Sequence, residues 1–161
     1  TLPYWNERAY EKANPDMFSL QKNWAKEHIK EEHRIKDSIV TTMSANKYNE
    51  KQSRAMSAHI DSGDYPEGLS TMAVFKDGDY SGAYLTFPQY GVAVDIPDNT
   101  CALFDSQVMH GVTPIRGEGT RYSITAYTDT RLATIGAAGK SERPIGHHNK
   151  DKRGSLEEFI T

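Results

Sequence analysis

Cysteine is nearly absent from this sequence, and the absence limits the kinds of fold it can form. The 161 residues include one cysteine, Cys101, so no disulfide can form within the chain. This excludes the small scaffolds that disulfides hold together, and it favours a reducing compartment inside the cell. Cys101 lies in the strand-like run CALFD, so we expect a small buried side chain rather than a nucleophile.

Long apolar runs are also missing. No stretch approaches the roughly 20 consecutive apolar residues that a membrane-spanning helix needs, so no membrane partner is predicted. No signal peptide is evident, and the chain opens on Thr1 rather than methionine. We therefore expect a trimmed or incomplete chain. Nothing in the sequence indicates an oligomeric state.

The third feature that is missing is a strong charge of one sign. The formal net charge is −3, which gives little general attraction to the phosphates of a nucleic acid. The charge is unevenly distributed, because residues 51–110 contain three basic and eight acidic residues. This acidic segment includes His59 and His110, and acidic residues near histidines suit a cation better than a phosphate.

Turn-forming residues divide most of the chain into short segments, about 8–12 residues apart, which is typical of a β-sandwich or jelly roll. The expected strands are residues 38–43, 55–60, 69–75, 83–87, 92–96, 101–105, 108–110 and 121–127, with a polar loop over 44–54. In VAVDI, the alternation of Val92, Val94 and Ile96 predicts a half-buried strand.

A helix is expected in front of these strands, from about Asp16 to Lys36, where an apolar stripe runs along a charged segment. Pro15 is expected to break any helix before it. The fold class is therefore mainly β with a flanking helix, a double-stranded β-helix or jelly roll. We expect one domain: a helical N-terminal support (1–37), a jelly-roll core (38–128) and a polar, basic tail (129–161).

Three residues form a candidate metal site. His59 and Asp61 lie two residues apart at the end of an expected strand, so their side chains point the same way. His110 is expected to end another strand, which a jelly roll can bring alongside. Two imidazoles and one carboxylate are the ligands of non-haem Fe(II) oxygenases, which leave positions free for a chelating co-substrate and O₂. The alternative is a structural role for all three residues. A zinc hydrolase is disfavoured because no H-E-x-x-H pattern occurs.

A candidate anion site follows in RYSITAY. Arg121, Ser123 and Thr125 alternate there, so they share one face of the expected strand. A guanidinium inside a jelly roll needs a partner. Arg121 meets either an internal carboxylate or the distal carboxylate of a ligand, to which the Ser123 hydroxyl can add a further hydrogen bond.

The order His59-x-Asp61, His110 and Arg121-x-Ser123 resembles the Fe(II)/2-oxoglutarate-dependent dioxygenase superfamily over about residues 40–128. The segments AHIDSGDYPEGLSTMAVF, GAYLTFPQYGVAVDIPDNTCALFDSQVMHGVTPI and RYSITAY are similar to its TET/JBP-like branch. Members of this branch hydroxylate the methyl group of 5-methylcytosine or thymine in nucleic acids. The resemblance thus implies a nucleic acid substrate, and the nucleus as the location if the source is a eukaryote.

The resemblance also implies roles for single residues. His59, Asp61 and His110 would bind Fe(II), and Arg121 with Ser123 would hold 2-oxoglutarate, which reacts with O₂. Asp64, five residues beyond His59, can approach the metal without binding it directly and is assigned to cofactor binding, or it caps the turn in DSGDYP. An algal relative uses ascorbate instead, so the co-substrate is 2-oxoglutarate or ascorbate.

Other functions stay open. The acidic middle of the chain favours a related hydroxylase of a small metabolite or protein side chain, and a non-catalytic jelly-roll module is the third possibility. The basic residues of the tail could attract phosphate, or they are simply solvated. These residues are Lys140, Arg143, Lys150, Lys152 and Arg153.

Overall fold

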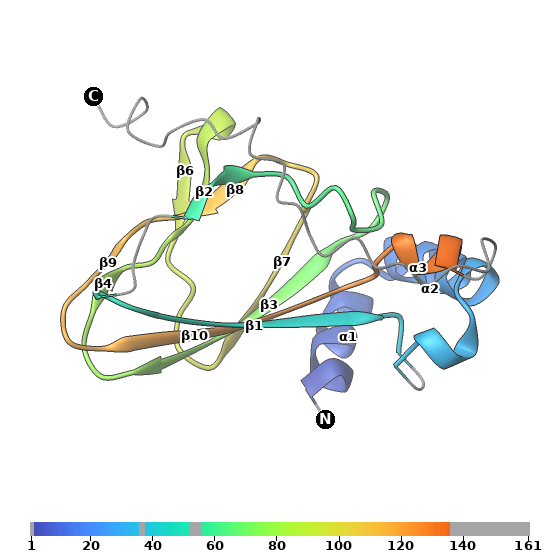
Figure 1. The fold of residues 1–161 in the computed structure, drawn as a ribbon, viewed down its shortest axis with the longest axis horizontal. Helices are drawn as coiled ribbons and strands as arrows, with labels where there is room; N and C mark the ends of the chain where they lie inside the picture. The colour runs from blue at the N-terminus through green and yellow to red at the C-terminus, as the bar shows by residue number, and fades with distance from the viewer. Residues whose placement is uncertain (1, 36–37, 52–55, 136–161) are drawn as a thin grey trace.

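Two four-stranded antiparallel sheets form the body of the protein (Figure 1). The computed structural model describes residues 2–35, 38–51 and 56–135. The larger sheet has the strand order β1-β10-β3-β7, and the smaller sheet has the order β2-β8-β5-β6. A two-stranded sheet joins β4 to β9. This arrangement confirms the mainly β, jelly-roll-like fold.

The strands are short, and most neighbours in a sheet are far apart in the sequence. They are β1 (Thr42–Asn49), β2 (Met56–His59), β3 (Ser70–Asp77), β4 (Ser81–Gly82), β5 (Leu85–Phe87), β6 (Val92–Val94), β7 (Thr100–Phe104), β8 (His110–Val112), β9 (Ile115–Arg116) and β10 (Thr120–Tyr127). The helices are α1 (Leu2–Ala13), α2 (Pro15–His28) and α3 (Arg131–Ile135), with 3₁₀ turns η1 (Glu31–His33) and η2 (Pro88–Tyr90).

The main apolar core lies between the two sheets. Leu85 of the smaller sheet packs with Met72 and Val74 of β3 and with Phe104 of β7. These side chains are all less than 9% exposed, so they are shielded from water on both sides. Burial of this kind stabilises the fold by about 1.5–3 kcal/mol for each large apolar side chain. The core therefore holds the two sheets face to face.

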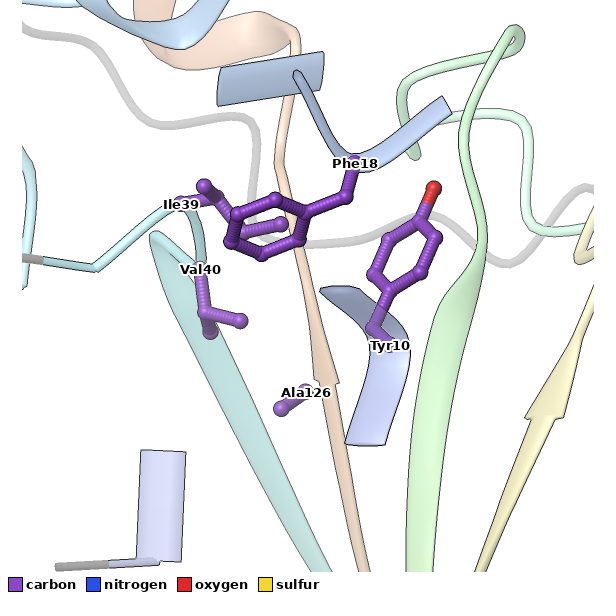
Figure 2. Close-up of a cluster of buried hydrophobic side chains, with 5 residues drawn as sticks. All are labelled: Tyr10, Phe18, Ile39, Val40 and Ala126. Carbon is purple, nitrogen blue, oxygen red and sulfur yellow. The ribbon is translucent and has the colours of Figure 1, made fainter. Parts of the chain in front are cut away.

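A second apolar cluster attaches the helices to the outer face of the larger sheet. Figure 2 shows Tyr10 of α1 and Phe18 of α2 beside Ala126 of β10. Ile39 and Val40, which precede β1, complete the cluster. The Tyr10 and Phe18 rings meet edge to face, with 5.6 Å between their centroids. The helices therefore pack on the outer face of β10 and support it. This strand carries Arg121 and Ser123 on its other face.

The prediction for the N-terminal segment was wrong in its boundaries. Residues 2–13 form helix α1, although we expected Pro15 to prevent a helix there. Pro15 instead begins α2, where Asn14 caps the helix by accepting a hydrogen bond from the Met17 amide at 3.2 Å. A proline restricts the residue before it and is well suited to the first turn of the helix that it opens.

Helix α2 ends at His28, earlier than the predicted end at Lys36. Ile29 adopts extended backbone angles, and its side chain is 2% exposed. Because Ile29 packs inside the protein in this extended conformation, tertiary packing overrides the helical pattern of the residues that follow.

The first strand was also misplaced by the sequence. We expected a strand over 38–43 and a polar loop over 44–54, whereas β1 spans Thr42–Asn49. Its residues alternate between half-buried and exposed, and the inward ones are polar or aromatic: Thr42, Ser44, Asn46 and Tyr48. A strand whose inner face is polar lacks the apolar alternation on which the prediction depended.

Strand β6 confirms the expected strand position but not its burial. Val92 and Val94 are 46% and 40% exposed, whereas Ile96 is 5% exposed. β6 is the last strand of the smaller sheet, so among the described residues no strand pairs with its outer edge. The half-buried pattern predicted for the two valines is therefore wrong.

The C-terminal end of the described chain, up to residue 135, forms a β-bridge and a short helix. Asp129 forms a β-bridge with Asp64, and α3 follows, so the first residues assigned to the tail lie against the body of the protein. The basic residues from Lys140 onward lie outside the described residues. Among the described residues, no helix combines the length and the apolar character needed to cross a membrane.

Candidate metal centre and co-substrate site

Pairing of two distant strands brings the predicted metal ligands together. His59 is the last residue of β2 and pairs directly with His110 in the antiparallel ladder between β2 and β8. His110 begins β8 rather than ending a strand, which corrects the sequence prediction. Because directly paired residues of a ladder point to the same side, both imidazoles face the same space. Their ring centroids are 4.6 Å apart.

Asp61 completes a tight group of donors. Its Oδ1 lies 3.4 Å from Nε2 of His59, and its Oδ2 lies 3.5 Å from Nε2 of His110. One donor atom from each of the three residues lies within 4.8 Å of the other two. The sequence named all three residues, and the structure brings them to one point.

Backbone carbonyls orient both rings. Nδ1 of His59 lies 2.9 Å from the carbonyl oxygen of Ser57, and Nδ1 of His110 lies 2.8 Å from that of Val108. A carbonyl only accepts, so Nδ1 carries the proton in each neutral ring and Nε2 is left with a lone pair. Such hydrogen bonds orient metal-binding histidines in known sites. Both Nε2 atoms are thus prepared to bind a cation at the centre of the group.

The charge of the group favours a cation. Burial alone raises the pKa of Asp61, but hydrogen bonds and charge from His110 and His59 outweigh burial and lower that pKa well below its ordinary value. The hydrogen bond that the Asp61 carboxylate accepts from protonated His59 is also the main cause that raises the pKa of His59, against the effect of burial. The carboxylate is therefore ionised at neutral pH and offers a negative charge between the two imidazole rings.

The donor set fits a ferrous ion. With bonds of about 2.1 Å and right angles between them, neighbouring donors are about 3 Å apart, close to the two measured separations. Two imidazoles and one carboxylate on one side leave the opposite positions free. The His110 side chain is 6% exposed, whereas those of His59 and Asp61 are 35% and 33% exposed. The centre is thus closed behind His110 and open beside the other two.

A turn that the sequence did not single out holds two of the donors in place. The Asp61 amide donates to the Ser106 carbonyl at 3.0 Å, and Nε2 of Gln107 donates to the Asp61 carbonyl at 3.0 Å. The same turn continues to Val108, whose carbonyl orients His110. Gln107 therefore links the backbone of one ligand to the segment that positions another. No local sequence pattern marks this contact, because it joins residues 46 positions apart.

Asp64 lies beside this centre but makes structural contacts. It is 6% exposed, and its Oδ2 accepts a hydrogen bond from the Ser70 hydroxyl at 2.5 Å. Burial raises the pKa of its carboxyl to about 6, against hydrogen bonds from Ser70 and Ser106 that lower it. It does not belong to the group of donors described above. A contact between Asp64 and a co-substrate stays a prediction.

Arg121 and Ser123 lie on the inner face of the larger sheet. Each is 2% exposed. The Arg121 guanidinium contacts the Met72 thioether, with 3.4 Å between Nη2 and Sδ, and it forms no salt bridge with any carboxylate of the described residues. Burial lowers its pKa, although Tyr80, Tyr48 and Asp95 oppose this effect. The internal carboxylate that the sequence left open as a partner is thus absent from the part of the chain that the structure describes.

A continuous set of side chains connects Arg121 to the metal centre. The Phe104 ring lies 5.1 Å from the His110 ring, edge to face. Phe104 and Met72 belong to the same core cluster, and Met72 contacts Arg121. The side chains of Phe104 and Met72 therefore lie between the His110 ring and the Arg121 guanidinium.

Polar residues of β1 flank the cationic site. Tyr48 pairs directly with Arg121, and Asn46 pairs with Ser123. We expected both residues to lie in a loop and assigned them no function. Ser44, Asn46 and Tyr48 are spaced two residues apart, which is the one sequence pattern that could have indicated a strand with a polar face. The pattern can be interpreted only when the pairing of β1 with β10 is known.

Comparison with known proteins identifies the family of this chain. The family model named Tet_JBP, the oxygenase domain of the 2OGFeDO superfamily, matches residues 6–130. The chain is also 29% identical over 109 residues to thymine dioxygenase JBP1 of Trypanosoma brucei brucei, and equally to that of strain 927/4 GUTat10.1. The match covers 68% of this chain but 12% of each relative, so the chain spans a small part of their length.

A solved structure has the same fold. It is described as NgTET1 in complex with 5mC DNA, and it matches with a TM-score of 0.62 and 14% identity. The match covers 80% of this chain and 50% of that one. Identity this low supports the fold alone. The family model, by contrast, covers most of the chain, and on that ground the chain belongs to the TET/JBP family of oxygenase domains in the 2-oxoglutarate- and iron-dependent dioxygenase superfamily.

Proposed function

We propose that this domain hydroxylates the 5-methyl group of a pyrimidine, 5-methylcytosine or thymine, in nucleic acid, using Fe(II), O₂ and 2-oxoglutarate. The observation that carries the proposal is the grouping of His59, Asp61 and His110 within a TET/JBP oxygenase domain. A curated relative is named a thymine dioxygenase, and the structural neighbour is described with 5mC DNA, which supports this substrate class. In a eukaryote the place of action would be the nucleus.

The residues divide the work of the site between them. When bound, Fe(II) would let O₂ oxidise 2-oxoglutarate to succinate and CO₂, with the second oxygen atom entering the substrate C–H bond as a hydroxyl. His59 and His110 would hold the ion through Nε2, and Asp61 would offset part of its charge. Arg121, helped by Ser123, would bind the distal carboxylate of 2-oxoglutarate and so orient its other end toward the metal.

The direction of substrate approach follows from the exposure of the three ligands. The His110 side is closed by the Phe104 and Phe87 rings, whose centroids are 5.1 and 6.4 Å from that of His110. The side of His59 and Asp61 is open, and Ile60 between them is 46% exposed. A methyl group would enter from this open side, whereas the co-substrate would occupy the interior.

The test is a reaction with a defined oligonucleotide. The protein is incubated with Fe(II), 2-oxoglutarate, O₂ and duplexes that contain 5-methylcytosine or thymine, and bases and succinate are measured by mass spectrometry. We expect a base that has gained one oxygen atom, together with succinate, and neither product from the His110→Ala variant. Succinate formation without any modified base would overturn the choice of substrate while leaving the iron chemistry intact.

One observation favours a second substrate class: residues 51–110 contain eight acidic and only three basic residues. An acidic segment of this kind attracts the phosphates of a nucleic acid poorly. Under this alternative the same centre would hydroxylate a small metabolite or a protein side chain. Tight, salt-sensitive binding of a duplex to the wild-type protein would exclude it.

A further inference from the structure

Arg131, the first residue of α3, places a cation beside the turn that begins at the metal ligand Asp61. The guanidinium lies against Gly63, because a methyl group in place of a Gly63 hydrogen would lie 2.9 Å from its Cζ and Nε atoms. The Gly63 carbonyl accepts hydrogen bonds from the Thr130 amide at 2.9 Å and from the Thr130 hydroxyl at 3.0 Å. The turn and the segment that carries Arg131 are therefore held together.

Asp129 fixes the orientation of this guanidinium. Its Oδ1 accepts hydrogen bonds from Nε of Arg131 at 2.7 Å and from the Arg131 amide at 3.0 Å, and its Oδ2 accepts from Nη2 at 2.6 Å. Two parallel bonds of this kind hold the guanidinium plane in one direction. The hydrogen bond to Asp129 is also the main cause that raises the pKa of Arg131, so the guanidinium stays charged.

The two members of this pair differ in their contact with water. The Asp129 side chain is 10% exposed, whereas that of Arg131 is 65% exposed. Nη1 of Arg131 forms no hydrogen bond with the described residues. The pair joins residues only two positions apart, and an exposed local ion pair contributes little to stability. The arrangement instead presents an oriented guanidinium, which loses little freedom when it binds an anion.

A cation at this place offsets the charge of the surrounding sequence. Residues 51–110 contain all three metal ligands, and they include eight acidic and only three basic residues. One of the three, Lys76, pairs with Asp95 at 3.4 Å. Arg131 lies outside this segment in the sequence but against it in the fold, so it supplies the positive charge that a polyanionic substrate needs there.

We propose that Arg131 binds a backbone phosphate of the nucleic acid, beside the nucleotide whose base enters the metal centre, and that Asp129 orients it for this contact. The inference rests on the proposed function, since it assumes that the substrate is a nucleic acid. Nη1 would donate to a non-bridging oxygen of the phosphate. A phosphate contact carries no sequence information, so Arg131 would fix the position of the strand and not the choice of base.

The test measures how binding depends on salt. Protein with Mn(II) and 2-oxoglutarate, kept without O₂, is titrated into a fluorescent duplex that contains 5-methylcytosine and thymine, at about 50 to 200 mM salt. Arg131→Gln should weaken binding roughly tenfold. It should also reduce the slope of log affinity against log salt by about 0.9, the value for one phosphate contact. Equal slopes for Arg131→Gln and wild type would overturn the inference.

Arg116→Gln is the matched control and should leave the slope unchanged. It removes the same charge at an exposed residue of β9, and Figure 1 shows β9 and α3 at opposite ends of the molecule. An equal loss of slope in this variant would mean that Arg131 acts only through the net charge, against the inference.

A double variant separates the contact from the charge that Asp129 is left with. Asp129→Asn combined with Arg131→Gln keeps the net charge of the wild type and leaves no buried carboxylate without a partner. It should bind the duplex as weakly as Arg131→Gln. Recovery of wild-type affinity would show that repulsion by Asp129 caused the loss, and the proposed contact would be wrong.

Two measurements with wild-type protein do not depend on the folding of a variant. In protein labelled with ¹⁵N-arginine, the Arg131 Nε resonance should shift when the duplex is added, whereas that of Arg116 should not. Replacing the linkages around 5-methylcytosine one at a time by uncharged methylphosphonate should reveal one position that weakens wild-type binding roughly tenfold. An unmoved Arg131 resonance, or no such position, would overturn the inference.

These outcomes are separable from failure of the proposed function. If the wild type modifies the base with Fe(II) and O₂ but Arg131→Gln binds the duplex as the wild type does, this inference alone fails. If the wild type neither binds nor modifies the duplex, the proposed function fails and the inference fails with it.

Discussion

The two charged ends of the interior are built in opposite ways. At the metal end, Asp61 lies 3.4 and 3.5 Å from two histidine nitrogens, and each ring is held by a backbone carbonyl. At the other end, Arg121 is buried at 2% exposure with a thioether as its hydrogen-bond acceptor. The first end has most of its contacts before any ligand arrives, whereas the second end lacks its anion.

This difference separates stability from binding. The metal end is preorganised, so an ion that binds there has little protein structure to rearrange. The arginine end holds an uncompensated charge that destabilises the protein until an anion joins it. The contrast also predicts how substitutions affect stability. Removing Arg121 should abolish ligand binding and stabilise the protein, whereas substitutions at the metal end should weaken binding without stabilising it.

The largest effect is expected at the metal end. Asp61→Ala removes the charged donor, and we expect metal affinity to fall by more than about a hundredfold, since even loss of a supporting contact costs 10–100-fold. The measurement is equilibrium dialysis with Mn(II) or Fe(II) under anaerobic conditions. Asp79→Ala, at an exposed turn residue, is the control and should bind metal as the wild type does. Equal metal content in the two variants would refute the site.

At the arginine end, Arg121→Met should separate the two properties. Binding of 2-oxoglutarate to the Mn(II) protein should be lost, whereas the free energy of unfolding should rise by about 1–3 kcal/mol because a buried charge is replaced by an apolar chain of similar size. Calorimetry measures binding, and urea denaturation measures stability. Marked destabilisation would mean that Arg121 has a structural anion after all, and it would remove the contrast between the two ends.

A smaller effect tests how the metal end is positioned. Gln107→Ala removes the hydrogen bond to the Asp61 carbonyl, which is 3.0 Å long, without touching a ligand side chain. Metal affinity should fall by about tenfold, in the range seen when supporting contacts of metal ligands are removed. The electron paramagnetic resonance spectrum of bound Mn(II) should also change. Gln89→Ala is the control at an exposed position, and identical affinities for both variants would contradict a positioning role.

The smallest effect is expected at Thr130, which contacts the loop after Asp61 and tests whether this side of the loop also positions the ligand. The Thr130 hydroxyl donates to the Gly63 carbonyl at 3.0 Å, and the Thr130 amide donates to the same oxygen at 2.9 Å. Thr130→Val keeps the amide bond and should lower the free energy of unfolding by about 1 kcal/mol. Metal affinity should stay within about threefold of wild type. A larger loss of affinity than in Gln107→Ala would show that this side holds the ligand loop instead.

Part of the fold could be predicted from the sequence, and the errors share a cause. The strands with clear apolar patterns, such as β3 and β10, appear close to where the sequence placed them. Strand β1 was missed because its inward residues are polar, as they must be opposite Arg121 and Ser123. Val92 and Val94 alternate like a half-buried strand, but β6 is an edge strand. Such positions are decided by neighbours that are distant in the sequence.

By itself, the sequence determined which donors are available and in what order: His59, Asp61, His110, then Arg121 and Ser123. Whether a residue can bind a metal ion or an anion depends on the chemistry of its own side chain, so this property can be predicted from each residue separately. Only the tertiary structure decided that β2 pairs with β8 and that Gln107 reaches Asp61. These contacts depend on long-range strand pairing, whose energy is spread over the whole core and leaves no local pattern.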